Sequence, residues 1–181
     1  MSQSPLRRVL LVGFMASGKT RVGRALAADL GWSFVDFDQM IESEQGRSVS
    51  DIFETHGEAH FRLLETQAAA KLLALDQVVL GSGGGWAARR GRLDELPPGT
   101  ETFWLQVSTG EALRRASLEP GRRPLLDRPD APEVAARLLE DRRPHYERAD
   151  WAVDTEHSSV EDVTAQILEI LMREYPEIVT R

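Results

Sequence analysis

The sequence contains no cysteine among its 181 residues. This absence excludes a disulfide framework, a thiolate metal site and a thiol nucleophile. No apolar run is long enough to cross a bilayer, and the polar residues 1–5 lead into the first apolar segment without a signal-peptide pattern. We therefore expect a cytoplasmic, soluble protein that does not act at a membrane.

Positive charge is also scarce, because 22 Lys and Arg residues stand against 29 Asp and Glu residues and leave a net charge of −7. Binding nucleic acid without regard to sequence normally needs a basic surface, so we expect no nucleic-acid partner. Only Lys19 and Lys71 are lysines. A length of 181 residues and a hydrophobic fraction of 41% suit a single domain with its own core, covering residues 1–181.

A phosphate-binding motif is the strongest positive feature. Residues 13–20 read Gly-Phe-Met-Ala-Ser-Gly-Lys-Thr, which matches G-x-x-x-x-G-K-[ST]. An apolar run over residues 8–12 precedes the motif and predicts a strand, and residues 21–30 carry apolar positions on one helical face. A glycine turn that merely begins a helix is the alternative, but strand, loop, Lys-Thr and helix coincide here.

The residue types of this loop explain its chemistry. Glycines bring backbone N–H groups close to a ligand, and the helix N-terminus adds partial positive charge for phosphate oxygens. Lys19 is expected to reach the β- and γ-phosphates of ATP, and the Thr20 hydroxyl to ligate Mg²⁺. The residues predicted to bind ATP here are Gly13, Ala16, Ser17, Gly18, Lys19 and Thr20.

Two carboxylates follow the next apolar run, residues 32–38. We expect a buried strand whose carboxyl end carries Asp36 and Asp38 on one side of the extended chain, at the ligand-binding edge of an open sheet. In a Mg-nucleotide enzyme one such carboxylate can hold the metal shell and the other can accept a hydroxyl proton. Alternatively, Asp38 is only the N-cap of the following helix.

Three glycines stand at the end of the next predicted strand, residues 77–80. Gly83, Gly84 and Gly85 suit close approach of a small polar substrate, or else form a flexible turn into a helix over residues 86–93. Upstream, residues 46–57 predict a turn and a short helix that Ser48 caps with Asp51, and a longer helix is expected over residues 58–73. On that helix Arg62 and Glu65 are spaced to pair, as a surface ion pair on the simplest interpretation.

The second half of the chain continues the alternation. Strands are predicted over residues 102–107 and 151–153, and helices over 110–116, from 132 to about 143, and after Ser159. Strands that alternate with helices indicate a parallel α/β sheet. Residues 117–130 carry three prolines and paired arginines, which is typical of a lid over transferring phosphate or of a plain solvated loop.

Several motifs in this order resemble the shikimate kinase family, a member of the nucleoside-monophosphate-kinase-like P-loop kinases. The resemblance covers about residues 9–171. It rests on the P-loop with Val22-Gly23-Arg24, Asp36-Phe37-Asp38, Gly57-Glu58 with Phe61-Arg62 and Glu65, Gly83-Gly84-Gly85, Arg123-Pro124-Leu125-Leu126, and Arg142 with Pro144 and Tyr146.

The resemblance implies a three-layer P-loop NTPase fold with a five-stranded parallel sheet of order 2-3-1-4-5, flanked by helices. It implies a lid at about residues 117–130, a substrate-binding helical region at about 38–66, and a monomer. The implied reaction transfers the ATP γ-phosphate to the 3-hydroxyl of shikimate, on the pathway to chorismate and the aromatic amino acids.

The resemblance also implies a role for each matching residue. Lys19, Asp38 and Arg123 would be catalytic, with Asp38 as the base and Arg123 as the lid arginine on the nucleotide phosphates. Thr20 and, through water, Asp36 would hold Mg²⁺. The substrate would contact Asp38, Arg62, Glu65, Gly83, Gly84, Gly85 and Arg142, with Arg62 and Arg142 on its carboxylate.

Departures from the family pattern are few. Ala16 stands where glycine is common, which we expect to be tolerated if its φ is negative, and Gly81-Ser82 precede the glycines where Ser82 replaces a common threonine. A related small-molecule kinase such as a gluconate kinase, a non-catalytic sensor of shikimate or nucleotide, and a nucleotide-binding structural module remain as alternatives.

Overall fold

One parallel sheet organises the fold. The computed structural model describes residues 4–118 and 129–178. Its five strands lie in the order β2-β3-β1-β4-β5 and pair in parallel throughout, which confirms the sheet that the resemblance implied. In chain order they are β1 (Arg8–Val12), β2 (Ser33–Asp36), β3 (Val78–Gly81), β4 (Thr100–Gln106) and β5 (Trp151–Asp154).

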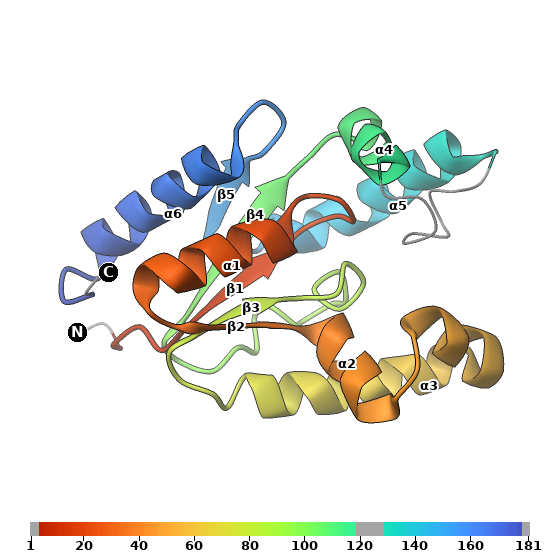
Figure 1. The fold of residues 1–181 in the computed structure, drawn as a ribbon, viewed down its shortest axis with the longest axis horizontal. Coiled ribbons are helices and arrows are strands. Elements are labelled where there is room, and N and C mark those ends of the chain that lie inside the picture. Colours follow the sequence, from red (N-terminus) through yellow and green to blue (C-terminus); the bar gives the residue numbers. More distant parts are fainter. Residues whose placement is uncertain (1–3, 119–128, 179–181) are drawn as a thin grey trace.

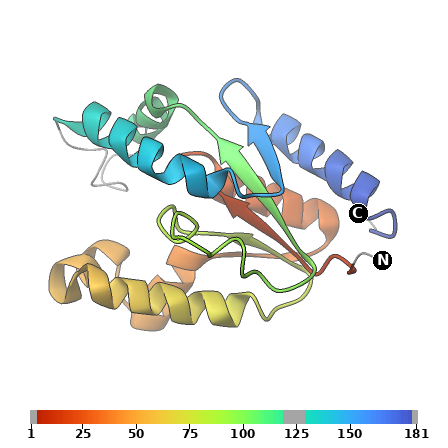
Figure 2. The same ribbon diagram turned by 180° about the vertical axis from the view of Figure 1, so that it is seen from behind.

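Helices cover both faces of the sheet and complete three layers. α1 and α6 lie on one face, and α3 and α5 lie on the other (Figures 1 and 2). The helices are α1 (Lys19–Leu30), α2 (Phe37–Gln45), α3 (Val49–Leu72), α4 (Thr109–Ser117), α5 (Ala131–Tyr146) and α6 (Val160–Glu174).

The central strand β1 divides the core between the two faces. Val9 and Leu11 pack among α1 and α6, whereas Leu10 and Val12 pack among α3, α5 and the segment after β3. All four side chains are fully buried. A parallel strand covered on both faces reads as a continuous apolar run, which is why residues 8–12 predicted this strand correctly.

The boundary between β2 and α2 differs from the prediction. β2 ends at Asp36, and Phe37 already begins the helix. Asp36 is the N-cap of α2, because its Oδ1 atom accepts hydrogen bonds from the N–H groups of Asp38 (3.0 Å) and Gln39 (3.4 Å). The expectation that one extended strand carries both carboxylates on the same side is therefore wrong, and so is the alternative that made Asp38 the cap.

The predicted helix over residues 86–93 is absent, and this part of the described chain forms successive turns. Its N–H groups bond three residues back, from Trp86 to Gly83 (3.1 Å) and from Arg92 to Arg89 (3.2 Å). Gly91 adopts the left-handed region with φ 83°. A helix that starts after three glycines and stops before Gly91 would be too short to offset the cost of its nucleation.

The helix caps agree with the sequence. Ser48 and Asp51 form the capping box of α3, and Ser159 with Asp162 forms that of α6. The two helices predicted around Gly57 are joined into α3, which is broken at that glycine by φ 78° and ψ 173°. Within residues 4–118 and 129–178, no helix combines the length and apolarity that crossing a membrane requires.

Candidate active site

The P-loop lies between β1 and α1, at the carboxyl edge of the sheet (Figure 1). Gly18 is the N-cap of α1 with φ 96° and offers no side chain to the first N–H groups of the helix. A Cβ atom on Gly13 would lie 2.5 Å from the Leu105 carbonyl oxygen of β4. The loop therefore needs glycine at both positions and presents backbone N–H groups to an anion.

Lys19 is folded over this loop. Its Nζ atom donates to the carbonyl oxygens of Gly13 (2.9 Å) and Phe14 (2.8 Å). The ammonium group thus stays beside the loop that is predicted to hold phosphate. Because Lys19 has a flexible stem, it can exchange these carbonyl contacts for phosphate oxygens without a change in the fold.

Ala16 has a positive φ of 61°, so the condition on which its substitution for glycine was expected to be tolerated is not met. A Cβ atom in the left-handed region costs roughly 1–2 kcal/mol. Residue 16 of the P-loop therefore carries local backbone strain, and contacts outside the loop help to hold it.

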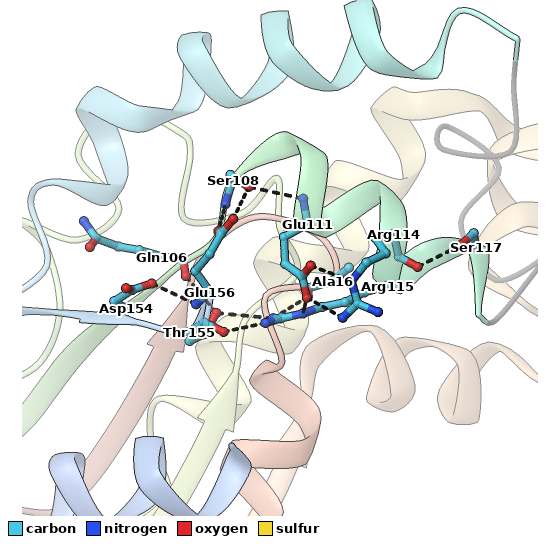
Figure 3. Close-up of polar contacts among 10 residues, drawn as sticks. All are labelled: Ala16, Gln106, Ser108, Glu111, Arg114, Arg115, Ser117, Asp154, Thr155 and Glu156. Atoms are coloured by element: carbon cyan, nitrogen blue, oxygen red, sulfur yellow. Dashed lines mark hydrogen bonds and ion pairs between the residues drawn. The ribbon is translucent and has the colours of Figure 1, made fainter. Parts of the chain in front are cut away.

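One such contact comes from Arg115 on α4 (Figure 3). Its Nη1 atom donates to the Ala16 carbonyl oxygen at 3.3 Å, while its Nε atom pairs with Glu111 at 2.7 Å. The same guanidinium donates to the carbonyl and the hydroxyl oxygen of Thr155, which follows β5. Arg115 therefore ties the P-loop to α4 and to the segment after β5.

A second contact joins the start of α4 to the segment after β5 (Figure 3). The Glu156 carboxylate accepts hydrogen bonds from the backbone N–H (2.8 Å) and the hydroxyl (2.6 Å) of Ser108. The sequence-based prediction missed Arg115, Thr155 and Glu156. The spacing of Glu111 and Arg115 indicated a helical ion pair, but no local pattern indicated its link to the P-loop.

Thr20 and Asp36 form the oxygen-rich side of the P-loop. The Thr20 hydroxyl donates to the Asp36 Oδ2 atom at 3.0 Å, while the other oxygen of Asp36 caps α2. A hydroxyl and a carboxylate are the hard donors that Mg²⁺ prefers. The described residues hold no cluster of three or more His, Cys, Asp or Glu side chains for a metal.

Asp38 has the most perturbed carboxyl group of the site. Burial, and after it the negative charges of Asp36 and Glu65, together raise its pKa to about 7 against the opposing charge of Lys19. Its Oδ1 atom is buried and has no hydrogen-bond partner in the described part of the chain. A carboxylate with this pKa is suited to accept a proton near neutral pH.

The three consecutive glycines after β3 each lie against a different charged group. A Cβ atom on Gly83 would lie 2.8 Å from Asp38 Oδ1 and 3.1 Å from Glu65 Oε1. On Gly84 it would lie 3.4 Å from Nη1 of Arg142, and on Gly85 2.9 Å from Nη1 of Arg62. The structure therefore brings together all the residues that were predicted to contact the substrate.

Arg62 and Glu65 pair as the spacing predicted, but not at the surface. Arg62 Nη1 lies 2.6 Å from Glu65 Oε2, and the Glu65 side chain is only 1% exposed. Glu58 adds a second partner for Arg62 at 2.9 Å. The interpretation as a surface ion pair is therefore wrong, because a buried carboxylate orients this arginine toward the glycine segment.

Tyr146 connects α5 to the glycine segment. It lies one turn after Arg142 on α5, is fully buried, and donates its hydroxyl to the Gly84 carbonyl oxygen at 2.5 Å. Burial raises the pKa of this phenol, and Arg142 opposes the rise. Tyr146 belonged to the motif that suggested the family, but its hydrogen bond to the glycine segment was not predicted.

Arg123, the predicted lid arginine, lies outside the described residues, as does most of the lid at 117–130. The remaining predicted site residues occupy one edge of the sheet. A P-loop, a hydroxyl–carboxylate pair, a carboxyl group with a pKa near 7 and two arginines together define a kinase of the P-loop class that acts on a small, anionic molecule.

Comparison with known proteins identifies the family within that class. The family model described as Shikimate kinase matches residues 15–172. A shikimate kinase of Moorella thermoacetica is 42% identical over 163 residues, which cover 90% of this chain and 93% of that protein. The chain belongs to the shikimate kinase family.

Solved structures agree with this assignment. Shikimate kinase from Acinetobacter baumannii in complex with shikimate superposes with a TM-score of 0.85 at 32% identity, covering 93% of this chain and 94% of that one. A gluconokinase from Sinorhizobium meliloti superposes with a TM-score of 0.63 at 21% identity, covering 97% of this chain and 96% of that one. The second likeness concerns the fold alone and gives no support to the gluconate alternative.

Proposed function

We propose that this protein transfers the γ-phosphoryl group of ATP to the 3-hydroxyl of shikimate, with Mg²⁺, through the residues described above. The observation that carries the proposal is the set of contacts at Gly83, Gly84 and Gly85, where Asp38, Arg142 and Arg62 converge beside the P-loop. A hydroxylated carboxylate needs this combination of a base and two guanidinium groups.

Arg62 and Arg142 bind the substrate carboxylate in this proposal. They approach the glycine segment from α3 and α5, so each can donate forked hydrogen bonds from its own side. Glu65 holds Arg62, and Tyr146 holds the carbonyl of Gly84. Arg62 is therefore oriented before the substrate arrives, which lowers the entropy cost of binding.

Asp38 accepts the proton of the 3-hydroxyl as that oxygen attacks the γ-phosphorus. The new oxygen–phosphorus bond replaces the bond to the β-phosphate oxygen, and ADP leaves. A pKa near 7 for Asp38 allows this carboxylate to take the proton at neutral pH.

Thr20 and, through water, Asp36 hold Mg²⁺ in the proposal, and their shared hydrogen bond places both groups at the P-loop. When bound, Mg²⁺ neutralises charge on the β- and γ-phosphate oxygens. The ATP phosphates contact Gly13, Ala16, Ser17 and Gly18, with Lys19 as their cation and Arg123 as the lid arginine that completes the set.

A small-molecule kinase of this kind is proposed to act as a cytoplasmic monomer, with shikimate and ATP as its partners and without nucleic acid or membrane. The single domain over residues 1–181 then comprises the P-loop core, the substrate-binding region at 38–66 and the lid at 117–130. Elution on a calibrated gel-filtration column at micromolar concentration tests the monomer, and an apparent mass near 40 kDa, twice the chain's 20.2 kDa, would contradict it.

The decisive assay is ADP release from Mg-ATP with shikimate, with gluconate, or with neither. Shikimate alone is expected to raise ADP release above the ATP-only background, and the product should carry one phosphoryl group at the 3-oxygen by ³¹P NMR. If shikimate failed to raise turnover although it bound, a sensor would be the better assignment. If gluconate raised it instead, the substrate would be wrong.

A further inference from the structure

Trp86 occupies an unusual position directly behind the substrate-binding residues. It follows Gly85 in the chain and is 1% exposed. Its indole ring packs edge-on against Phe37, with ring centroids 5.2 Å apart, and Phe37 immediately precedes Asp38. The ring thus joins the glycine segment to the start of α2, which carries Asp38.

Arg92 connects Trp86 to α3. Its guanidinium lies over the Trp86 ring, 5.6 Å from the centroid, and Nη2 donates to the Thr66 hydroxyl at 2.9 Å. Thr66 belongs to α3, directly follows Glu65, and donates its own hydroxyl to the Arg62 carbonyl oxygen at 2.9 Å. Arg92 therefore connects the turns after β3 to the helical turn that carries Arg62 and Glu65.

These contacts matter because the backbone-to-backbone hydrogen bonds of residues 84–95 are local to the turns, whereas the links to α2 and α3 come from side chains. The segment forms turns rather than a helix, and the Trp86 Nε1 atom is buried without a hydrogen-bond partner in the described part of the chain. The position of Trp86 therefore depends on packing and on Arg92. A shift of the Trp86 ring would therefore displace Gly85, which lies against Arg62. It would also displace Phe37, the neighbour of Asp38 in the chain.

We propose that Trp86 and Arg92 are positioning residues that set the spacing between the glycine segment, α2 and α3, and thereby the width of the shikimate site. The inference rests on the proposed function for the identity of the substrate. Neither side chain is assigned a contact with substrate or nucleotide. Arg92 acts through Thr66 and Trp86, and Trp86 acts through Gly85 and Phe37.

The test measures the KM for shikimate and the KM for ATP separately in Arg92→Gln and Thr66→Val. Each variant is expected to raise the KM for shikimate about five- to tenfold and to leave the KM for ATP within about twofold, because only the substrate walls lose their spacing. Arg92→Lys keeps a cation over the indole ring and one donor, so it should recover most of the loss.

The double variant Arg92→Gln/Thr66→Val tests whether the two residues act as one unit. If they do, its KM for shikimate should equal that of the worse single variant rather than the product of the two effects. Arg90→Gln is the matched control, because this exposed neighbour has no ion-pair or hydrogen-bond partner for its side chain among the described residues. It should leave both KM values unchanged.

A merely structural role would lower the melting temperature and leave both KM values as they are, and that result in folded Arg92→Gln and Thr66→Val would overturn the inference. Thr66→Val keeps the volume of the side chain, which makes it the safer variant if Arg92→Gln folds poorly. Failure of the proposed function looks different, because the unmodified protein would then show no shikimate-dependent turnover at all.

Discussion

Gly83 lies against the carboxylate of Asp38 so closely that a Cβ atom would approach Oδ1 to 2.8 Å. The backbone of Gly83 does not have a positive φ, so this glycine is needed for space and not for conformation. The contact links the end of β3 to the first turn of α2, which are 45 positions apart in the chain. It leaves no room for a side chain at residue 83 beside the predicted base.

Gly83→Ala should therefore lower kcat through Asp38. We expect a loss of about 10- to 100-fold in kcat, because the new methyl group displaces the carboxylate from the substrate hydroxyl, while the KM for ATP stays within about twofold. Steady-state kinetics with shikimate measure this split. Gly110→Ala on α4 is the control, since a Cβ atom there meets only Ser108 Oγ at 3.9 Å. An unchanged kcat in Gly83→Ala would show that Asp38 tolerates the displacement.

Asp38→Asn should separate activity from stability. Removal of the base is expected to lower kcat about 10²- to 10⁴-fold. The folded-state pKa of Asp38 lies at about 7, above its ordinary value of 3.8, so the folded protein disfavours the charged carboxylate. Wild-type stability therefore falls as pH rises from about 4 to 7, and Asp38→Asn should be more stable than wild type above pH 7 by about 2–4 kcal/mol.

The measurement for this variant is urea unfolding at pH 4.5 and at pH 8. The stability advantage of Asp38→Asn should be small at pH 4.5, where Asp38 is protonated in the folded state, and large at pH 8. In wild type, kcat/KM for shikimate should decline below about pH 7 as Asp38 takes up a proton. An advantage of equal size at both pH values would contradict the raised pKa.

Ala16→Gly tests the strain in the P-loop. With φ at 61°, alanine at this position costs roughly 1–2 kcal/mol in the folded state, whereas glycine costs about 0.4–1 kcal/mol through the entropy of the unfolded chain. The substitution should therefore stabilise the protein by up to about 1 kcal/mol in chemical denaturation. Ala136→Gly, on an exposed turn of α5, should destabilise it by about 0.5–1 kcal/mol. Two changes of the same sign would contradict the strain.

Asp36→Asn separates the metal role of Asp36 from its role as a helix cap. Asparagine caps as well as aspartate, so the free energy of unfolding should stay within about 1 kcal/mol of wild type. Loss of the charge beside Thr20 should weaken the apparent affinity for Mg²⁺ about 10- to 100-fold, measured from the Mg²⁺ dependence of turnover at fixed ATP. The same change at Asp51, whose carboxylate accepts the Ser48 N–H in the capping box of α3, should leave the Mg²⁺ dependence unaltered.

Local signals sufficed for much of the fold. The continuous apolar run of β1, the glycines of the P-loop and the Ser48 and Ser159 caps each depend on residues within a few positions of one another. Sequence patterns report such short-range interactions directly. The family motifs added the strand order, which no local pattern contains, and the structure confirmed it.

Local sequence patterns gave wrong predictions where contacts between distant residues determine the structure. The turns after Gly85 form around Trp86, which packs against Phe37 of α2, 49 positions away in the chain. Glu65 is buried close to Gly83, yet its spacing from Arg62 is the same as that of a surface pair. Helical periodicity describes one element and cannot say what covers it.

The sequence by itself thus determined the class of this protein, because a phosphate-binding loop is a local device of glycines, a lysine and a helix N-terminus. Tertiary structure alone decided how Asp36 divides its two oxygens between Thr20 and α2, which side chain each glycine meets, and that Arg115 holds the Ala16 carbonyl. These contacts join residues between 2 and 99 positions apart, and most of them exist only when the sheet has brought its carboxyl ends to one edge.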